Sequence, residues 1–430
     1  MTTDISADTK IFERRESQVR SYCRAFDAVF TRATGSTLYD TDGHAYTDFL
    51  SGCSSLNYGH NDPDMKAALI DHITEDGIAH ALDMYTRPKA AFLETFERLI
   101  LAPRGMDHKV MMTGPTGANA VESAIKLARK VTGRTNVISF TNGFHGMTLG
   151  ALSLTGNSGK RGGAGVTLGD VTHLPFEGSL GKDVDTLAMI ETMLGNDSSG
   201  IDAPAAIILE LVQGEGGLNA ASRTWVEGIA RLAKQHGAML IVDDIQAGIG
   251  RTGDFFSFDD MDIQPDMITL AKSLSGFGLP FALTLIRPEL DIWKPAEHNG
   301  TFRGNTHAFV TAKTALEKFW ADDAFKTQVA EKAKVLTQRL TRIADLIPGA
   351  RLKGRGMMQG VDTGNGDLAA AICAEAFTRG LIIETSGAED EVVKVLAPLT
   401  TPMDQFSEGL DTLEASARAC LNAHVKIAAE

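Results

Sequence analysis

The residues best suited to chemistry lie just beyond two apolar runs, each with the composition of a buried strand. The run 239–242 (MLIV) precedes Asp243 and Asp244, and the run 267–270 (MITL) precedes Ala271 and Lys272. Open α/β sheets carry ligand chemistry at the carboxyl ends of their strands, which is where these side chains are expected. Taken alone, the Asp pair is open to several interpretations: metal ligand, base, partner of a cofactor ring nitrogen, or helix-capping acid.

The lysine narrows these alternatives. Lys272 stands among Ala, Leu, Ser and Gly, whereas most lysines occupy wet, charged surfaces. At a dry strand end, desolvation favours the neutral amine, whose lone pair can form an imine. Asp243 lies about thirty residues earlier, the length of one βαβ unit, so the two residues can lie on adjacent strands. Pyridoxal phosphate needs this combination, a lysine for its aldehyde and an acid that keeps its pyridine nitrogen protonated.

A phosphate also needs a binding turn, and the segment 113–119 (TGPTGAN) is a candidate. It precedes a helical pattern in which Val121, Ala124, Ile125 and Ala128 share one face. Small residues before a helix expose backbone N–H groups at the positive end of the helix dipole. The segment lacks both the Walker ending and the GxGxxG spacing, so by itself it indicates only a turn.

Two further loops follow strand-like runs. In 142–146 (NGFHG), Phe144 could stack on a flat ring, while His145 has no partner in view and is interpreted as structural. In 209–217 (LELVQGEGG), Glu210 and Glu215 could face a cationic substrate, although a plain polar loop explains this spacing equally well.

The order of elements predicts an α/β fold. From about residue 61, strands (137–140, 205–209, 239–242, 267–270) alternate with helical patterns such as 225–235, which is typical of a mostly parallel sheet covered by helices. Residues 38–50 indicate a hairpin that turns at Asp42-Gly43. We expect a large cofactor-binding domain over 61–320 and a smaller α+β domain built from residues 1–60 and 321–430.

Composition excludes several functions. The 430 residues carry a formal net charge of −14, which argues against nucleic-acid and membrane surfaces. Four scattered cysteines show no metal-ligand spacing, so we expect reduced thiols and no metal site. The opening residues MTTDISADTK lack the basic start and apolar run of a signal peptide, and no stretch has membrane-span length. A cytoplasmic protein is expected.

Together and in order, these motifs resemble the class III (ω-amino acid) aminotransferases, a family of fold type I pyridoxal-phosphate enzymes. The matches are the helix start at 117–129 (GANAVESAIKLAR), the Phe-His-Gly turn, the Gln-Gly-Glu loop, and the segment 243–253 (DDIQAGIGRTG) with the lysine loop after it. The resemblance spans roughly residues 35–400. The ordered set is highly specific, whereas each motif alone is not.

The resemblance implies a role for each matched residue. Lys272 would form the Schiff base and shuttle the proton, and Asp243 would pair with the pyridine nitrogen. Other cofactor contacts would come from Phe144 and Ile245 on the ring faces, Gln246 at the ring 3-oxygen, Thr116, Gly117 and Ala118 at the phosphate, and Thr301 at the phosphate of a partner subunit. A homodimer at least is therefore expected.

On the substrate side, Glu210 and Glu215 match two acids that line the family's substrate pocket. Lys394 falls where the ornithine-type branch has a carboxylate-binding arginine, which is a departure from that branch. Lys394 and Arg251 are the candidates for binding the α-carboxylate of the substrate.

The segments 13–23, 56–61 and 290–299 resemble a narrower branch, the one that forms L-2,4-diaminobutyrate in ectoine synthesis. This implies ping-pong transfer of an amino group from L-glutamate to L-aspartate 4-semialdehyde, giving L-2,4-diaminobutyrate and 2-oxoglutarate. Alternatives are acetylornithine, ornithine, 4-aminobutyrate or siderophore-pathway diaminobutyrate aminotransferases. Less favoured are a pyridoxal-phosphate decarboxylase or aminomutase, and a non-enzymatic binding protein.

Overall fold

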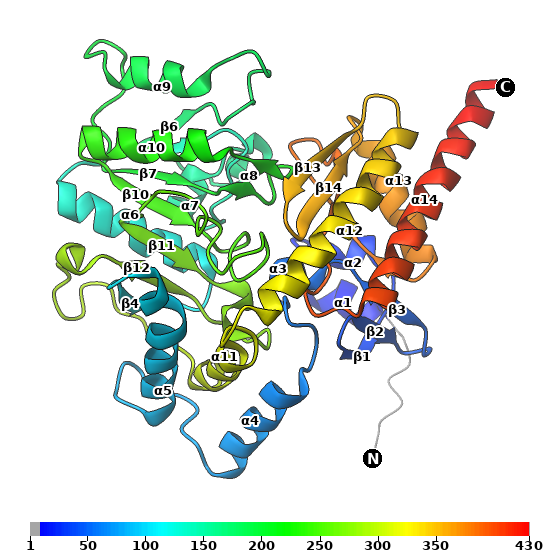
Figure 1. Cartoon of the computed structure of the whole chain (residues 1–430), viewed down its shortest axis with the longest axis horizontal. Coiled ribbons are helices and arrows are strands. Elements are labelled where there is room, and N and C mark those ends of the chain that lie inside the picture. Colours follow the sequence, from blue (N-terminus) through cyan, green and yellow to red (C-terminus); the bar gives the residue numbers. More distant parts are fainter. Residues whose placement is uncertain (1–8, 430) are drawn as a thin grey trace.

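A computed structural model describes residues 9–429. Its largest sheet has the strand order β4-β12-β11-β10-β7-β5-β6 (Figure 1). The strands are β4 (Lys109–Met112), β5 (Val137–Phe140), β6 (Val171–Leu174), β7 (Ala206–Leu209), β10 (Met239–Asp243), β11 (Met267–Leu270) and β12 (Leu283–Ile286). All neighbours pair in parallel except β12, which is antiparallel to both β11 and β4. The predicted mostly parallel α/β sheet is confirmed.

Helices cover both faces of this sheet because its strands are apolar on both sides. Alternate residues such as Ile208 and Ile241 share a core with α6 (Gly117–Thr132), while Ile207 and Leu240 share the other core with α10 (Arg223–His236). The side chain of Thr116 caps the N-terminus of α6, and that of Ser222 caps α10. Each helix ends at a glycine in the left-handed conformation, Gly133 for α6 and Gly237 for α10. Capping thus fixes where α6 starts, beside the strand ends.

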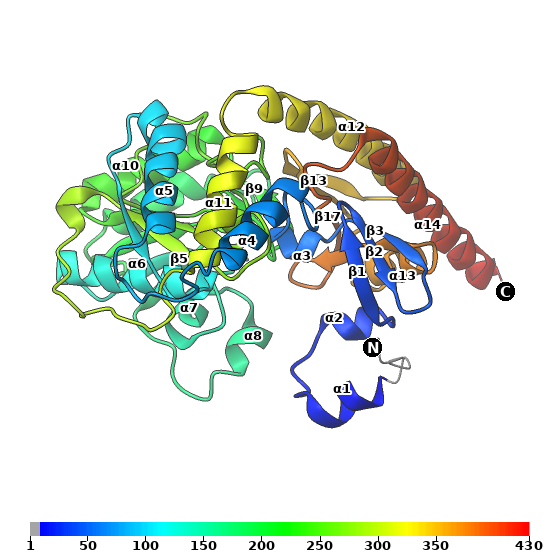
Figure 2. The same ribbon diagram turned by 90° about the horizontal axis from the view of Figure 1, so that it is seen from below.

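A smaller lobe lies beside the large sheet (Figure 1). One of its sheets joins β1 (Phe30–Thr34), β2 (Thr37–Asp40) and β3 (Ala45–Asp48) to β15 (Leu381–Ile382); the other has the order β13 (Arg351–Arg355), β14 (Met358–Asp362), β17 (Val392–Val395), β16 (Glu384–Ser386). The predicted hairpin is confirmed as β2–β3. The long helices α12 (Ala324–Leu346) and α14 (Met403–Ala429) run along the outer side (Figure 2).

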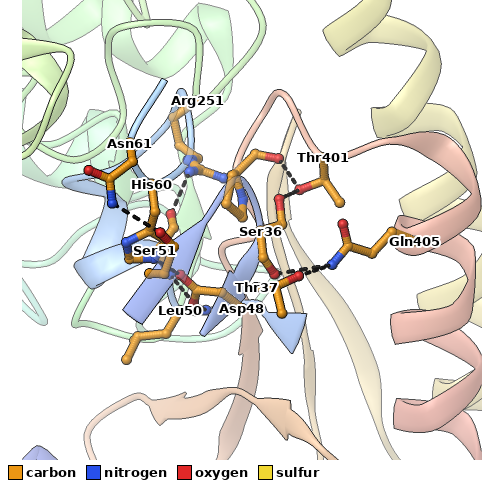
Figure 3. Close-up of polar contacts among 12 residues, drawn as sticks. Ser36, Thr37, Asp48, Leu50, Ser51, His60, Asn61, Arg251, Thr401 and Gln405 are labelled. Atoms are coloured by element: carbon orange, nitrogen blue, oxygen red, sulfur yellow. Dashed lines mark hydrogen bonds and ion pairs between the residues drawn. The ribbon is translucent and has the colours of Figure 1, made fainter. Parts of the chain in front are cut away.

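Contacts between distant segments hold the two chain ends together in this lobe. The hydroxyls of Ser36 and Thr401 are hydrogen-bonded at 2.6 Å, and Gln405 Nε2 donates to Thr37 Oγ1 at 2.8 Å (Figure 3). Strand β15 also pairs in parallel with β3. Segments from both halves of the chain therefore build this lobe together.

The remaining elements are shorter. Helices are α1 (Lys10–Arg15), α2 (Tyr22–Ala25), α3 (Ser51–Ser54), α4 (Pro63–Thr74), α5 (Arg87–Phe96), α7 (Leu149–Leu154), α8 (Ser158–Gly162), α9 (Thr186–Leu194), α11 (Thr306–Phe319) and α13 (Gly366–Thr378), with short turns η1 (Glu97–Leu101), η2 (Ala102–Arg104), η3 (Lys272–Ser275) and η4 (Pro288–Leu290), and a hairpin of β8 (Val212–Gln213) and β9 (Asn219–Ala220). Within residues 9–429, no helix is both long and apolar enough to cross a membrane.

Candidate active site

Strand alternation places Asp243 on the α6 side of the sheet, and a backbone turn after β11 brings Lys272 into the same cavity. In β10, Ile241 faces α6, and Asp243, two residues on, therefore faces α6 as well. Strand β11 pairs directly with β10, as the sequence spacing predicts, and Ala271, which follows β11, packs against Ala120 of α6. Lys272 follows at once. Its backbone takes a left-handed φ of 52°, a conformation that costs energy for a residue with a side chain and that ends the strand.

Three groups hold the Asp243 carboxylate. His145 Nδ1 lies 2.7 Å from Oδ2, the Thr269 hydroxyl donates to Oδ1 at 3.1 Å, and the Ile245 N–H donates to Oδ1 at 3.3 Å. Burial alone would lower the pKa of His145, but its hydrogen bond to Asp243 and the charges of Asp243 and Glu210 raise it. The His145 ring and the Thr269 hydroxyl thereby fix the orientation of the Asp243 carboxylate. His145, interpreted as structural from sequence, is thus a direct partner of the proposed ring-pairing acid.

Glu210 lies behind the Phe-His-Gly turn. Its carboxylate accepts the N–H of Phe144 at 2.8 Å and that of Gly214 at 3.1 Å, so it joins two loops of the site. Burial raises the pKa of Glu210 to about 7; the charge of His145 opposes this rise, and that of Asp243 adds to it. Glu210 therefore lines the site and also stabilises the conformation of the Phe-His-Gly turn.

A cavity of about 380 Å³ brings most of the predicted residues together. Its walls include the predicted cofactor and substrate residues Thr116, Gly117, Ala118, Phe144, Glu210, Glu215, Asp243, Ile245, Gln246 and Lys272. The first N–H groups of the 16-residue helix α6 have no intrahelical partner and suit a phosphate. A Cβ on Gly117 would lie 2.9 Å from the Ile245 side chain, so only glycine leaves this wall open. A phosphate turn, apolar walls, a buried acid and a lysine together fit pyridoxal phosphate.

A buried charge cluster adjoins the cavity. Lys394 is fully buried and contacts Glu215 at 3.0 Å and Glu384 at 2.9 Å. Burial alone would raise the pKa of Glu215, but the positive charges of Lys394 and Lys272 lower this pKa to about 2. Gln246 Nε2 donates to Glu215 at 3.4 Å. Lys394, a candidate for the substrate carboxylate, is therefore already paired with two carboxylates of its own chain, and the sequence did not single out Glu384.

Like Lys394, two further predicted residues lie outside the cavity walls. Arg251 is fully buried and donates to Ala397 O at 2.7 Å, Asn57 Oδ1 at 2.6 Å and Ser51 Oγ at 3.3 Å, the last visible in Figure 3. Its guanidinium joins the large lobe to the small one. Because these contacts occupy its N–H donors, few donors remain for a substrate carboxylate. Thr301 is exposed, and its carbonyl accepts from His80 Nε2 at 2.9 Å. Within this chain, Thr301 does not meet the phosphate turn.

The fold and this site define a pyridoxal-phosphate enzyme. The Aminotransferase class-III family model matches residues 19–416, and the chain belongs to this family. Its cofactor is pyridoxal phosphate, in agreement with the cavity described above.

Among curated relatives, the diaminobutyrate–2-oxoglutarate transaminase of Halalkalibacterium halodurans is 53% identical over 96% of this chain and 97% of that protein. The enzyme of the same name from Vibrio cholerae serotype O1 is 54% identical to this chain, over 94% of this chain and 98% of that protein. Among solved structures, the ornithine aminotransferase of Toxoplasma gondii superposes with a TM-score of 0.84 at 24% identity, covering 96% of this chain and 95% of that one. At that identity the likeness shows the fold alone.

Proposed function

We propose that this chain is a transaminase that moves the amino group of L-glutamate to L-aspartate 4-semialdehyde, giving L-2,4-diaminobutyrate and 2-oxoglutarate. One observation carries the proposal: relatives more than half identical over nearly the whole chain bear the name diaminobutyrate–2-oxoglutarate transaminase. The segments 13–23, 56–61 and 290–299, which cofactor binding does not require, support the same substrate. We further propose a role in ectoine synthesis.

The site residues divide the work of a ping-pong reaction between them. When bound, pyridoxal phosphate supplies an aldehyde that takes up amino groups and a ring that withdraws electrons from the reacting carbon. Asp243, held by His145 and Thr269, keeps a proton at the ring nitrogen. With the cofactor bound, the Nζ of Lys272 would move a proton between the reacting carbon of the substrate and the cofactor carbon C4′, in general acid–base fashion. The turn at Gly117 binds the phosphate.

The proposal includes a homodimer in which Thr301 completes the neighbour's phosphate site. Thr301 is exposed and lies outside its own chain's cavity, and large apolar side chains lie exposed in the same region, with Phe302 66% and Tyr85 100% accessible. A cytoplasmic location is also proposed. The free thiols of Cys23, Cys53 and Cys373 are typical of a reducing compartment.

Half-reactions of the purified holoenzyme test the substrate. Glutamate and diaminobutyrate should each convert the cofactor spectrum to its amine form, whereas ornithine and 4-aminobutyrate should do so much more slowly. Faster conversion by ornithine or 4-aminobutyrate than by diaminobutyrate would replace the proposed substrate with that amine. Carbon dioxide release, or turnover without a second substrate, would indicate a decarboxylase or an aminomutase.

A further inference from the structure

The substrates of the proposed function share one chemical feature. In glutamate, a carboxylate lies three carbon–carbon bonds from the carbon that exchanges its amino group. In diaminobutyrate and aspartate semialdehyde, whose terminal carbon reacts, a carboxylate lies the same three bonds away. One cation at a fixed distance from the reacting carbon could therefore serve both half-reactions. This inference rests on the proposed function for the identity of the substrates.

A second cavity, of about 580 Å³, adjoins the cofactor cavity and shares Phe144 and Glu215 with it. The large lobe contributes Ser158 and Lys160 to its walls, and the small lobe contributes residues 385–390. Among these, Ser386 is only 3% exposed, and its hydroxyl has no hydrogen-bond partner. A buried hydroxyl without a partner costs free energy unless a ligand or water satisfies it. This cavity therefore has the polar lining of a site for part of a substrate.

The available cations in and around the two cavities are few. Arg251 is bonded to its own chain, and Lys394 is paired with two carboxylates. Among the described residues that line the cavities, the cationic side chains apart from His145 are Lys272 and Lys160. Lys272 is needed for the cofactor, which leaves Lys160.

The surroundings of Lys160 fit this role. Its Nζ lies 4.5 Å from the centre of the Phe144 ring, at the boundary between the two cavities. Within residues 9–429, Nζ has no ion pair or hydrogen bond, and the residue is half-buried. The charge of Lys160 is among those that lower the pKa of Glu215, but the two side chains form no ion pair, so this half-buried ammonium can accept the carboxylate of a substrate.

We propose that Lys160 binds the carboxylate that both substrates carry three bonds from the reacting carbon, and that it thereby sets the substrate length for both half-reactions. The same cavity also contains Glu215, Glu389 and Asp390. These acids suit the ammonium group that lies beside this carboxylate in diaminobutyrate. Glutamate lacks an ammonium group at that position, so Lys160 is the contact that both substrates have in common.

Pairs of substrates with and without this carboxylate test the proposal. L-2-aminobutyrate is glutamate without its distal carboxylate, and 1,3-diaminopropane is diaminobutyrate without its carboxylate. A charge-assisted hydrogen bond contributes enough that Lys160→Gln should lower kcat/KM for glutamate and diaminobutyrate by roughly 10- to 100-fold. The values for 2-aminobutyrate and diaminopropane should change by no more than about twofold, because neither substrate makes the contact. Lys160→Arg should restore much of the loss, and Lys182→Gln, at an exposed lysine, should have no effect.

Binding of glutarate, an unreactive dicarboxylate, gives a readout that does not depend on turnover. Its Kd, measured by calorimetry on the holoenzyme, should rise by roughly 10- to 100-fold in Lys160→Gln. Equal losses for substrates with and without the carboxylate would overturn the proposal, since Lys160 would then act only by supporting Phe144. No loss for any substrate would also overturn it. If wild-type enzyme rejects diaminobutyrate, the proposed function fails, but the glutamate and 2-aminobutyrate pair still tests Lys160.

Discussion

Replacing Lys394 by Met should strongly destabilise the fold. Lys394 is fully buried and, among the residues that the structure describes, is the only cation that forms ion pairs with both Glu215 and Glu384. Its removal leaves two neighbouring carboxylates without a counter-charge. Breaking a buried ion pair from one side costs about 3–5 kcal/mol, because the remaining charge stays out of water. Since Glu215 is 24% exposed and keeps some hydration, we expect the lower end of that range, about 3 kcal/mol.

The pH dependence of this loss follows from Glu215, whose pKa is lowered from 4.5 to about 2. A carboxyl with a lowered pKa stabilises the fold above its unfolded value and loses that contribution as the pH falls toward the folded value. The difference between wild type and Lys394→Met should thus be largest near neutral pH. It should shrink on acidification as the two facing carboxylates of the variant take up protons.

Urea unfolding at pH 7.5 and pH 5.0, followed by circular dichroism, measures both effects. The double variant Lys394→Met/Glu384→Gln removes one of the stranded charges and should recover part of the lost free energy. Lys66→Met, at an exposed lysine, is the matched control and should change stability by no more than about 0.5 kcal/mol. A loss below about 1 kcal/mol for Lys394→Met at pH 7.5, or a loss that grows on acidification, would refute the reasoning.

Three further predictions concern the site. His145→Gln should lower kcat roughly 10- to 100-fold with cofactor still bound, because Asp243 loses a charged hydrogen-bond partner at 2.7 Å; an unchanged kcat would contradict this. Gly117→Val should weaken cofactor affinity at least about tenfold in absorbance titrations, since its Cβ would meet a side chain at 2.9 Å, whereas Gly169→Ala, with open space around it, should not. Burial raises the pKa of Asp244 to about 7, so its stabilising contribution is complete below pH 3.8 and is lost above pH 7. Asp244→Asn should therefore remove a stability decline of about 1.4 kcal/mol per pH unit between pH 3.8 and pH 7, and identical pH profiles of the melting temperature for the two proteins would contradict it.

The sequence predicted those features that depend on neighbouring strands. Lys272 and Asp243 each follow an apolar run, and one βαβ unit between them makes their strands adjacent, so their proximity follows from local pattern and spacing. The turn at Gly117 was found for the same reason, since a small-residue segment before an amphipathic helix is a local signal.

Contacts across long sequence separations were not predictable in this way. His145 and Asp243 are 98 positions apart, and no local pattern links them. Arg251 donates a hydrogen bond to Ala397 O, 146 positions further along the chain. The residues around Arg251 therefore contain no pattern that predicts its role in joining the two lobes. Glu384 lies on a short strand of the small lobe and reaches Lys394 only because β16 and β17 pair. The two strands are short and the segment between them gives no hairpin signal, so the pairing of this acid with Lys394 could not be predicted from the sequence.

Lys272 is the residue that we propose binds the cofactor covalently. Treating the holoenzyme with sodium borohydride fixes the linkage between pyridoxal phosphate and its lysine as a stable amine, and peptide mass analysis then locates it. We expect one phosphopyridoxyl group per chain, on the peptide that contains Lys272, and no such product in Lys272→Ala. Recovery of the group on a different lysine, with Lys272 unmodified, would contradict it.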